Sequence, residues 1–552
     1  MFISRVHVGD LGHRLDSSFY NPRLMAISKR ITDAFESRAL DELVDPGRRI
    51  TNGVRGPDWQ DSEYKLIRLQ DCKDWVVDAA NAASISLEQF QENRRCKLGP
   101  EDIVVAIGGY VGNAAVFLGD AQAVIGQHSA VLPARKNGPA DSRFLLTYLN
   151  SYYGESLFQR FVSGTVQPGV NLEDLRGLPA PLPHNVAQRY IGNRVRQAER
   201  LRAQASSLTV SARVLIESLI EGQISESQLI EAQQALDAGD GTLDRTILAR
   251  IKPDGIDRIG EPRLVAIVRI PARLLDHRLD ARYNSPEAVA IRKRIRDLSI
   301  PTARVDSLVK LTCGPFGSTL TADEHDPNGD MLLVQPTNIS GDYFEYTKSW
   351  RIRSADAEDK GLKSYDPGTL LFARVGVYPH VGVLPHGVPR ATISSSMIAG
   401  ESLGKLDPHY AFSFFRSSAG YKLLLAAQKI TAQPTIGTDE IGATALVLPH
   451  QYAQRYIGDK VRQAEQRRFL ANSLAVSAKL LVESLIDNQL TESQLIAAQQ
   501  ALEAGDDTLD RAILARLKTD GIDGSDEPLF PDLDQLYDLL SRATREATAD
   551  DV

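Results

Sequence analysis

The chain has 552 residues, of which 43% are hydrophobic and 24% are charged, and its formal net charge at pH 7 is −8. This composition is typical of globular protein and provides apolar residues for several cores, so we expect three or four structural units. The negative charge argues against a uniformly basic surface but leaves local basic patches open.

Membrane and secretory functions are disfavoured. No apolar run approaches the roughly 18–20 residues that span a bilayer, and Met1–Arg5 does not open the apolar stretch of a signal peptide. The three cysteines, Cys72, Cys96 and Cys313, include no C-x-x-C pair, which disfavours a disulfide framework or a zinc ribbon. We therefore expect a cytoplasmic protein with no membrane contact and no metal.

The first segment in chain order, residues 1–185, combines strand and turn signals. Short apolar runs predict strands at Tyr64–Leu69, Ile103–Ile107 and Ala114–Leu118. Glycine pairs and Gly-Pro steps separate these runs, and the segment ends in a short apolar run rich in proline. We expect a compact mixed α/β domain here.

Residues 186–260 predict helices. A stripe of apolar residues spaced by three, four or seven predicts a coiled-coil helix from Val186 to Glu221, about 50–55 Å long. Its proposed helix-pairing residues include Ile191, Val195, Leu208, Leu215 and Leu219. A capping Ser225 then predicts a second helix, and a third begins at Thr242 after the Ala-Gly-Asp break at 238–240.

The second half has the same plan. Residues 261–451 form another variable segment, with strands expected at Met331–Val334, Thr369–Val375 and Ala445–Leu448. Residues 452–552 form a second helical region, in which Thr491 is the expected cap of the shorter helix. Its pairing stripe includes Ile457, Val461, Leu474, Leu481 and Leu485.

An internal duplication underlies this plan. Residues 187–257 align with 453–523 without a gap, and roughly 50 of these 71 positions are identical. Two similar apolar stripes in one chain can pack on each other, whereas two separate helical bundles are the simpler alternative. We expect an α+β protein in which two mixed α/β domains are separated by two repeated long-helix regions. The long helices would form an antiparallel coiled coil with pseudo-two-fold symmetry.

Motifs for catalysis are missing from the sequence. It has no Asn/Asp/Ser-Pro-Pro-aromatic turn of an amino-methyltransferase and no phosphate-binding loop of the Gly-x-x-x-x-Gly-Lys-Ser/Thr type. Pro57-Asp58 and Glu63-Tyr64-Lys65 lie too close together for a nuclease motif. His380 and His386 have no nearby carboxylate or cysteine to complete a metal set. We expect the chain to be non-catalytic and to hold no cofactor.

The variable–repeat–variable–repeat layout resembles the specificity subunits of type I restriction–modification systems over nearly the whole chain. Local patterns agree, among them Ile67–Asp71, Gly164–Gln167, Gly314–Ser318, Val334–Ile339 and Gln433–Thr435. The resemblance implies two target-recognition domains that read a bipartite double-stranded DNA sequence. It also implies two methyltransferase subunits as partners, which use S-adenosylmethionine to make N6-methyladenine, and possible addition of a motor–nuclease subunit.

Three alternatives stay open. Because the repeats continue well beyond the long helix, the partners could belong to a related phage-defence complex. The acidic net charge would suit a DNA mimic or a regulatory protein, but the variable segments mix both signs. A single-chain modification enzyme would need the methyltransferase turn that the sequence lacks.

Polar loop residues are the expected DNA contacts, because arginine suits guanine and asparagine suits adenine through paired hydrogen bonds. In the first domain they are Arg48, Arg49, Thr51, Asn52, Arg55 and Gln167. In the second they are Lys310, Ser318, Thr319, Gln335, Asn338 and Arg374. A basic stretch at 269–296 could follow phosphates and an acidic one at 217–244 could face a partner, or both could be solvated helix faces.

Overall fold

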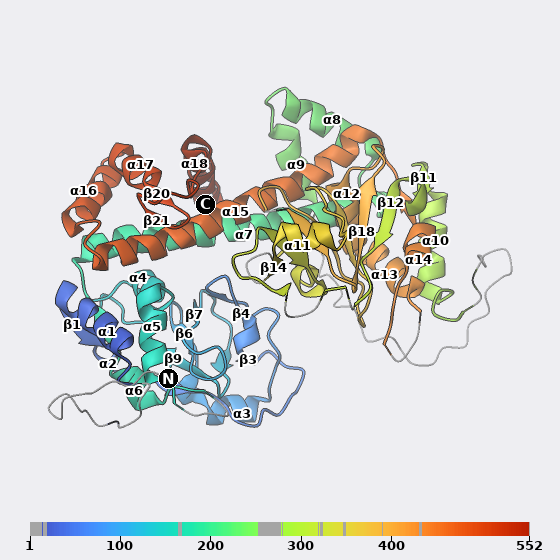
Figure 1. Cartoon of the computed structure of the whole chain (residues 1–552). Helices are drawn as coiled ribbons and strands as arrows, with labels where there is room; N and C mark the ends of the chain where they lie inside the picture. Colours follow the sequence, from blue (N-terminus) through green and yellow to red (C-terminus); the bar gives the residue numbers. More distant parts are fainter. Residues whose placement is uncertain are drawn as a thin grey trace. The chain divides into compact units, whose positions relative to one another are not determined.

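The computed structural model describes residues 14, 19–163, 168–251, 278, 280–317, 319–320, 324–345, 349–388, 390–429 and 433–550 (Figure 1). The chain divides by contact into two compact units. Unit 1 consists of Met1–Leu201 and Leu470–Val552, and unit 2 of Arg202–Phe469. Each unit therefore combines one variable segment with parts of both helical repeats.

The variable domain of unit 1 is a sheet covered by short helices. Its six strands follow the order β2 (Thr51–Asn52), β9 (Ser129–Leu132), β6 (Ile103–Ala106), β7 (Ala114–Val116), β5 (Val76–Val77) and β4 (Cys72–Lys73). Two more pairs are parallel β3 (Lys65–Ile67) with β8 (Ala123–Ile125), and antiparallel β1 (Ser37–Ala39) with β10 (Pro179–Pro181). The helices are α1 (Pro22–Ala34), α2 (Leu40–Leu43), α3 (Leu87–Glu92), α4 (Ser142–Leu149), α5 (Tyr152–Phe161) and α6 (Leu172–Arg176).

The variable domain of unit 2 is built in the same way. A four-stranded sheet has the order β12 (Val309–Cys313), β18 (Met397–Ser402), β15 (Leu370–Ala373) and β16 (Val381–Val383). The other strands are β14 (Trp350–Ile352), β13 (Met331–Val334) and β17 (Ala391–Ile393) in one sheet, and β11 (Thr302–Arg304) with β19 (Ala445–Val447). The helices are α10 (Pro286–Asp297), α11 (Ser354–Asp359), α12 (Pro408–Arg416), α13 (Ser418–Ala427) and α14 (Thr438–Ala443).

The two variable domains share a topology although their sequences differ. The order β2-β9-β6-β7 in unit 1 corresponds to β12-β18-β15-β16 in unit 2, and a parallel pair adjoins each sheet. Both domains also need a glycine at one close approach. A Cβ on Gly53 would lie 1.9 Å from the carbonyl oxygen of Ile125, and one on Gly314 would lie 1.9 Å from that of Ser394.

A long helix begins each of the two repeats. Helix α7 (Asn185–Glu221) has residues 185–201 in unit 1, and helix α15 (Gln451–Ile486) has residues 470–486 there; the remainders belong to unit 2. Within unit 2, Arg467 donates to Gln204 at 3.3 Å, while residues 212–219 share a core with residues 453–461. The helices are therefore antiparallel, and the α+β class with two mixed domains and paired long helices is confirmed. The sequence-based domain boundaries stay predictions.

Shorter elements follow each long helix. In unit 2 these are α8 (Glu226–Asp237) and α9 (Thr242–Arg250); in unit 1 they are α16 (Glu492–Glu503), α17 (Thr508–Ala515), β20 (Leu517–Lys518), β21 (Gly521–Ile522) and α18 (Leu533–Asp550). The predicted caps are confirmed, since the Ser225 and Thr491 hydroxyls accept from the backbone N–H of residues 228 and 494. Gly239 and Gly505 end the helices at φ values of +85° and +84°.

Among the described residues, one helix is long and apolar enough to cross a membrane. This is α15, whose most apolar 18-residue window has a mean hydropathy of 1.5. Because 67% of that window is buried inside the protein, α15 has the surroundings of a core helix. Its apolar residues pack against the rest of the chain.

Candidate nucleic-acid interface

Four loops meet at one edge of the unit 1 sheet, which we call loop edge 1. They contain residues 53–56, 107–113, 126–128 and 163–170, of which 164–167 lie outside the described residues. Backbone hydrogen bonds join them: the Val54 N–H donates to Ile125 at 2.8 Å, Ile107 to His128 at 2.9 Å, and Val170 to Ile107 at 2.9 Å. These hydrogen bonds connect the loops into one surface.

Unit 2 has an equivalent surface, loop edge 2, made of residues 314–317, 374–380, 394–396 and 429–436, with 430–432 outside the description. Two of these bonds recur at the matching residues: Arg374 donates to Ser396 at 2.8 Å, and Ile436 to Arg374 at 2.9 Å. In addition, Gly314 donates to Met397 at 2.9 Å. Each variable domain thus presents a similarly braced set of loops.

The loops 53–56 of loop edge 1 and 314–317 of loop edge 2 occupy equivalent positions but differ in the side chains at their tips. Gly53 and Gly56 flank the tip in unit 1, where Arg55 is exposed, and Gly314 and Gly317 flank it in unit 2. The residue at the position of Arg55 is Phe316, which is 88% exposed. An exposed guanidinium can donate two hydrogen bonds to guanine, whereas a phenyl ring can contact a thymine methyl group or stack on a base.

The hairpin turns between the central strands also expose aromatic side chains. Tyr110 lies between β6 and β7 and is 81% exposed, and Tyr378 lies at the equivalent turn between β15 and β16 and is 56% exposed. A third ring, Trp59, is exposed in unit 1 with the Arg68 guanidinium 5.4 Å from its centroid. Large exposed rings on braced loops are typical of surfaces that bind another molecule. Sequence reasoning missed them, although the signal was an aromatic residue within a glycine-rich turn.

Of the predicted DNA contacts in unit 1, some are exposed and others have hydrogen-bond partners inside the domain. Arg49 and Arg55 are exposed, and Gln167 lies outside the described residues. Arg48 instead forms a bidentate pair with Asp102, with N–O distances of 2.6 and 3.0 Å. Thr51 and Asn52 form strand β2 and accept hydrogen bonds from the Arg95 guanidinium. Both terminal nitrogens of Arg48 therefore have acceptors inside the domain.

In unit 2 the predicted residues are also divided. Arg374 is exposed on loop edge 2 and Lys310 is exposed on β12, whereas Thr319 and Gln335 are half-buried. Ser318 lies outside the described residues. Asn338 is only 3% exposed; its Oδ1 accepts from the Gln335 N–H at 2.7 Å, and its Nδ2 donates to Glu345 and Ser349. Asn338 therefore holds its own turn together in this structure.

The predicted helix-pairing residues follow α7 and α15. Leu208 is only half-buried. The other nine are at most 3% exposed: Ile191, Val195, Leu215, Leu219, Ile457, Val461, Leu474, Leu481 and Leu485. Leu208 and Leu474 occupy the same position of the repeat, so the difference between them arises from their surroundings.

Each variable domain is joined to its long helix by the same polar junction. In unit 1 Asp141 caps α4 and pairs with Arg196 of α7 at 2.7 Å, and its backbone N–H donates to the side-chain oxygen Oε1 of Gln188 at 2.8 Å. In unit 2 Asp407 makes the corresponding contacts with Arg462 and with Gln454. The junction fixes the direction of each domain relative to the first turns of its helix.

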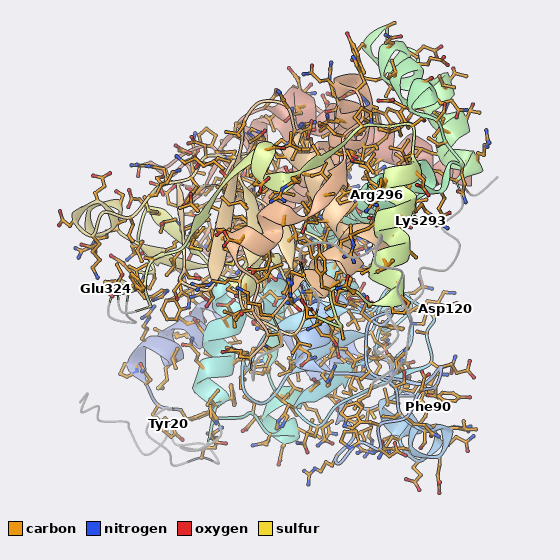
Figure 2. The ribbon with its side chains drawn as sticks, turned by 90° about the vertical axis from the view of Figure 1, so that its right-hand side faces the viewer. Tyr20, Phe90, Asp120, Lys293, Arg296 and Glu324 are labelled. Atoms are coloured by element: carbon orange, nitrogen blue, oxygen red, sulfur yellow. The ribbon has the colours of Figure 1, made fainter. Side chains whose placement is uncertain are left out.

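The predicted basic stretch is residues 269–296, and helix α10 contains much of the part that the structure describes. Lys293, Arg294 and Arg296 are exposed on α10, and Figure 2 labels Lys293 and Arg296 on this helix. Arg292 is used internally, since it donates to the Tyr283 carbonyl at 2.8 Å and stacks on that ring. Residues 269–277 lie outside the description.

The described residues of the two variable domains offer surfaces that could contact another molecule. Within the described ranges, no group of three or more His, Cys, Asp or Glu side chains is placed to hold a metal ion. The two loop edges carry exposed guanidinium groups and aromatic rings on loops that backbone hydrogen bonds hold together.

Comparison with known proteins identifies a protein of similar sequence. No protein-family model matches the chain. The specificity subunit of the type I restriction enzyme EcoBI from Escherichia coli is 28% identical over 181 residues, which cover 32% of this chain and 37% of that protein. The match therefore spans little more than a third of that relative. It confirms the resemblance inferred from the sequence: the chain is similar to specificity subunits of type I restriction enzymes.

Solved structures of such proteins are more distant. The S subunit of a type I restriction–modification system from M. genitalium is 13% identical, with 82% of this chain and 95% of that chain covered and a TM-score of 0.34. The HsdS subunit from Thermoanaerobacter tengcongensis is 15% identical, with 87% and 96% covered and a TM-score of 0.22. TM-scores below 0.5 do not establish a common fold, so the fold assignment rests on the strands and helices of this chain.

Proposed function

We propose that the chain is the DNA-specificity subunit of a type I-like restriction–modification complex, in which it reads a bipartite double-stranded target. The observation that carries the proposal is the recurrence of one braced loop edge in two domains of different sequence, each attached to a near-identical helical frame. Such a layout is what independent reading of two half-sites requires, because the loops can vary while the frame is kept.

The two half-sites should differ in base chemistry. Arg55 at the tip of loop edge 1 suits a guanine, and Phe316 at the tip of loop edge 2 suits a thymine methyl group. Tyr110 and Tyr378 would add contacts that depend on stacking or on groove shape. The antiparallel helices would act as the spacer between the half-sites.

The chemistry would belong to the partners. The chain is proposed to be non-catalytic and cytoplasmic and to bind no cofactor, with two methyltransferase subunits supplying S-adenosylmethionine-dependent N6-adenine methylation. A motor–nuclease subunit would join them in a restricting complex. This division of labour agrees with a sequence that lacks the methyltransferase turn.

The proposal is tested by exchanging residues 300–448 for the corresponding segment of a relative with another target. Both helical repeats are kept, and methylated adenines are mapped by long-read sequencing in a host that supplies the partners. We expect one half-site to change while the other half-site and the gap persist. A change in both half-sites would show that the domains do not read independently.

A biochemical control addresses the catalytic assignment. The purified full-length chain is incubated with tritiated S-adenosylmethionine and DNA of mixed sequence. We expect no label above the blank, and addition of the partner subunits should restore transfer. Robust methylation by the pure chain would contradict the proposed division of labour.

A further inference from the structure

The two helical extensions are nearly identical in sequence but differ in what covers them. Residues 242–250 of α9 read Thr-Leu-Asp-Arg-Thr-Ile-Leu-Ala-Arg, and residues 508–516 differ only by alanine in place of the second threonine. In unit 1, α17 lies against the amphipathic helix α18, whose buried residues include Leu536, Leu539 and Ala543 (Figure 1).

Three contacts attach α18 to the start of α17. The Tyr537 hydroxyl donates to the carboxylate of Asp510. The Arg511 guanidinium lies 4.1 Å from the centroid of the Tyr537 ring and pairs with Asp534 at 2.7 Å. Asp534 and Tyr537 are one helical turn apart, so both reach the same Asp-Arg dipeptide.

Unit 2 contains the same acceptor group, because Asp244 of α9 is the counterpart of Asp510. One oxygen of Asp244 accepts from the Tyr456 hydroxyl at 2.6 Å and from Lys460 at 2.5 Å, as Asp510 does from Tyr190 and Arg194. For its other oxygen, no donor is present in the part of the chain that the structure describes. The Asp244 side chain is 17% exposed, compared with 1% for Asp510.

Residues near Asp244 are also more exposed to solvent than their counterparts in unit 1. Arg245, the counterpart of Arg511, is exposed. Leu248 and Ile251 are half-buried, whereas their counterparts Leu514 and Leu517 are at most 1% exposed. The outer face of α9 therefore offers a carboxylate oxygen and a guanidinium in the arrangement that α18 contacts on α17, next to two half-buried apolar side chains.

We propose that this face of α9 in unit 2 is a docking site for an amphipathic helix of a partner protein that carries an acidic residue three positions before a tyrosine. The face in unit 1 accepts such a helix through the same residues, and the exposed Arg245 supplies the complementary charge. The inference does not depend on DNA recognition by the loop edges.

The test uses a fluorescent peptide with the sequence of residues 529–550 and the full-length chain. In unit 1 the tethered α18 competes at high effective concentration, so added peptide should bind at unit 2. We expect saturable binding of one peptide per chain by fluorescence anisotropy. Arg245→Glu should weaken it about tenfold, because an ion pair and a cation–π contact are replaced by repulsion.

Matched variants test whether the peptide binds at α9 of unit 2. Arg511→Glu, the same change in unit 1, should leave the affinity no weaker than in the native chain. A peptide with Asp534→Arg should bind the native chain poorly and regain affinity for the Arg245→Glu chain. Absence of saturable binding, or equal losses in both arginine variants, would overturn the proposal. Self-association of the native chain that Arg245→Glu abolishes would assign the face to a second copy instead of a partner.

Discussion

Replacing Asp510 with alanine should destabilise unit 1 more than any single change on the protein surface. The Asp510 carboxylate lies 2.6 Å from both the Arg194 guanidinium and the Tyr190 hydroxyl, and it also accepts from Tyr537. The side chains of Arg194 and Asp510 are each 1% exposed. Burial raises the pKa of the Tyr190 phenol well above its ordinary value, so this hydroxyl remains a donor that needs an acceptor.

Removal of the carboxylate leaves the Arg194 charge buried without a counter-charge, which typically costs about 3–5 kcal/mol. Loss of the acceptor for the two phenol groups adds to this cost. For a unit of this size, about 4 kcal/mol corresponds to a fall of roughly 8–16 °C in the unfolding temperature. Differential scanning calorimetry of the full-length chain should show this shift in the transition of unit 1.

Two controls separate the buried charge from a general effect of substitution. Asp244→Ala removes the counterpart in unit 2, where the carboxylate is 17% exposed and the flexible Lys460 can turn its ammonium toward water. Its cost should therefore be smaller. The double variant Asp510→Leu with Arg194→Met removes both charges and should recover most of the loss. An Asp510→Ala loss no larger than that of Asp244→Ala, or a double variant as unstable as the single one, would refute the reasoning.

Three other outcomes are expected. Leu474→Ala should cost about 2–5 kcal/mol in thermal unfolding and the half-buried Leu208→Ala clearly less, so equal losses would contradict their different burial. Gly314→Ala should destabilise unit 2 and weaken DNA retention because its Cβ meets a carbonyl oxygen at 1.9 Å, whereas Gly317→Ala, with 3.6 Å to its nearest neighbour, should be tolerated. Iodoacetamide at pH 8 should alkylate the exposed Cys313 first, since burial raises the pKa of both other thiols; peptide mass mapping that finds all three equally modified would contradict this.

The candidate site was only partly predictable. Arg55 and Arg374 were selected because of residue type and loop context, and both are exposed on the loop edges. The same criteria selected Asn338, whose amide is used inside its own turn, and they overlooked Phe316 and Tyr378. Residue type indicates which bonds a side chain can form, but the partner that satisfies them is set by distant segments that a sequence pattern does not locate.

The amino-acid sequence by itself determined the long helices, the caps and breaks of the shorter helices that follow them, and the duplication of the helical frame. These follow from local signals: apolar spacing along α7 and α15, the hydroxyls of Ser225 and Thr491, and glycines in the left-handed region. Strands such as β13 were also evident from short apolar runs bounded by turns.

Only the tertiary structure decided that two dissimilar variable segments share one topology, and that identical repeat positions have different surroundings. Leu208 and Leu474 differ in burial although they occupy the same position of the repeat. Asp510 accepts from Tyr537 of α18 and its side chain is 1% exposed, whereas the side chain of Asp244 is 17% exposed. The physical reason is that burial and hydrogen-bond partnership depend on which segments meet in space, and two copies of one sequence meet different neighbours.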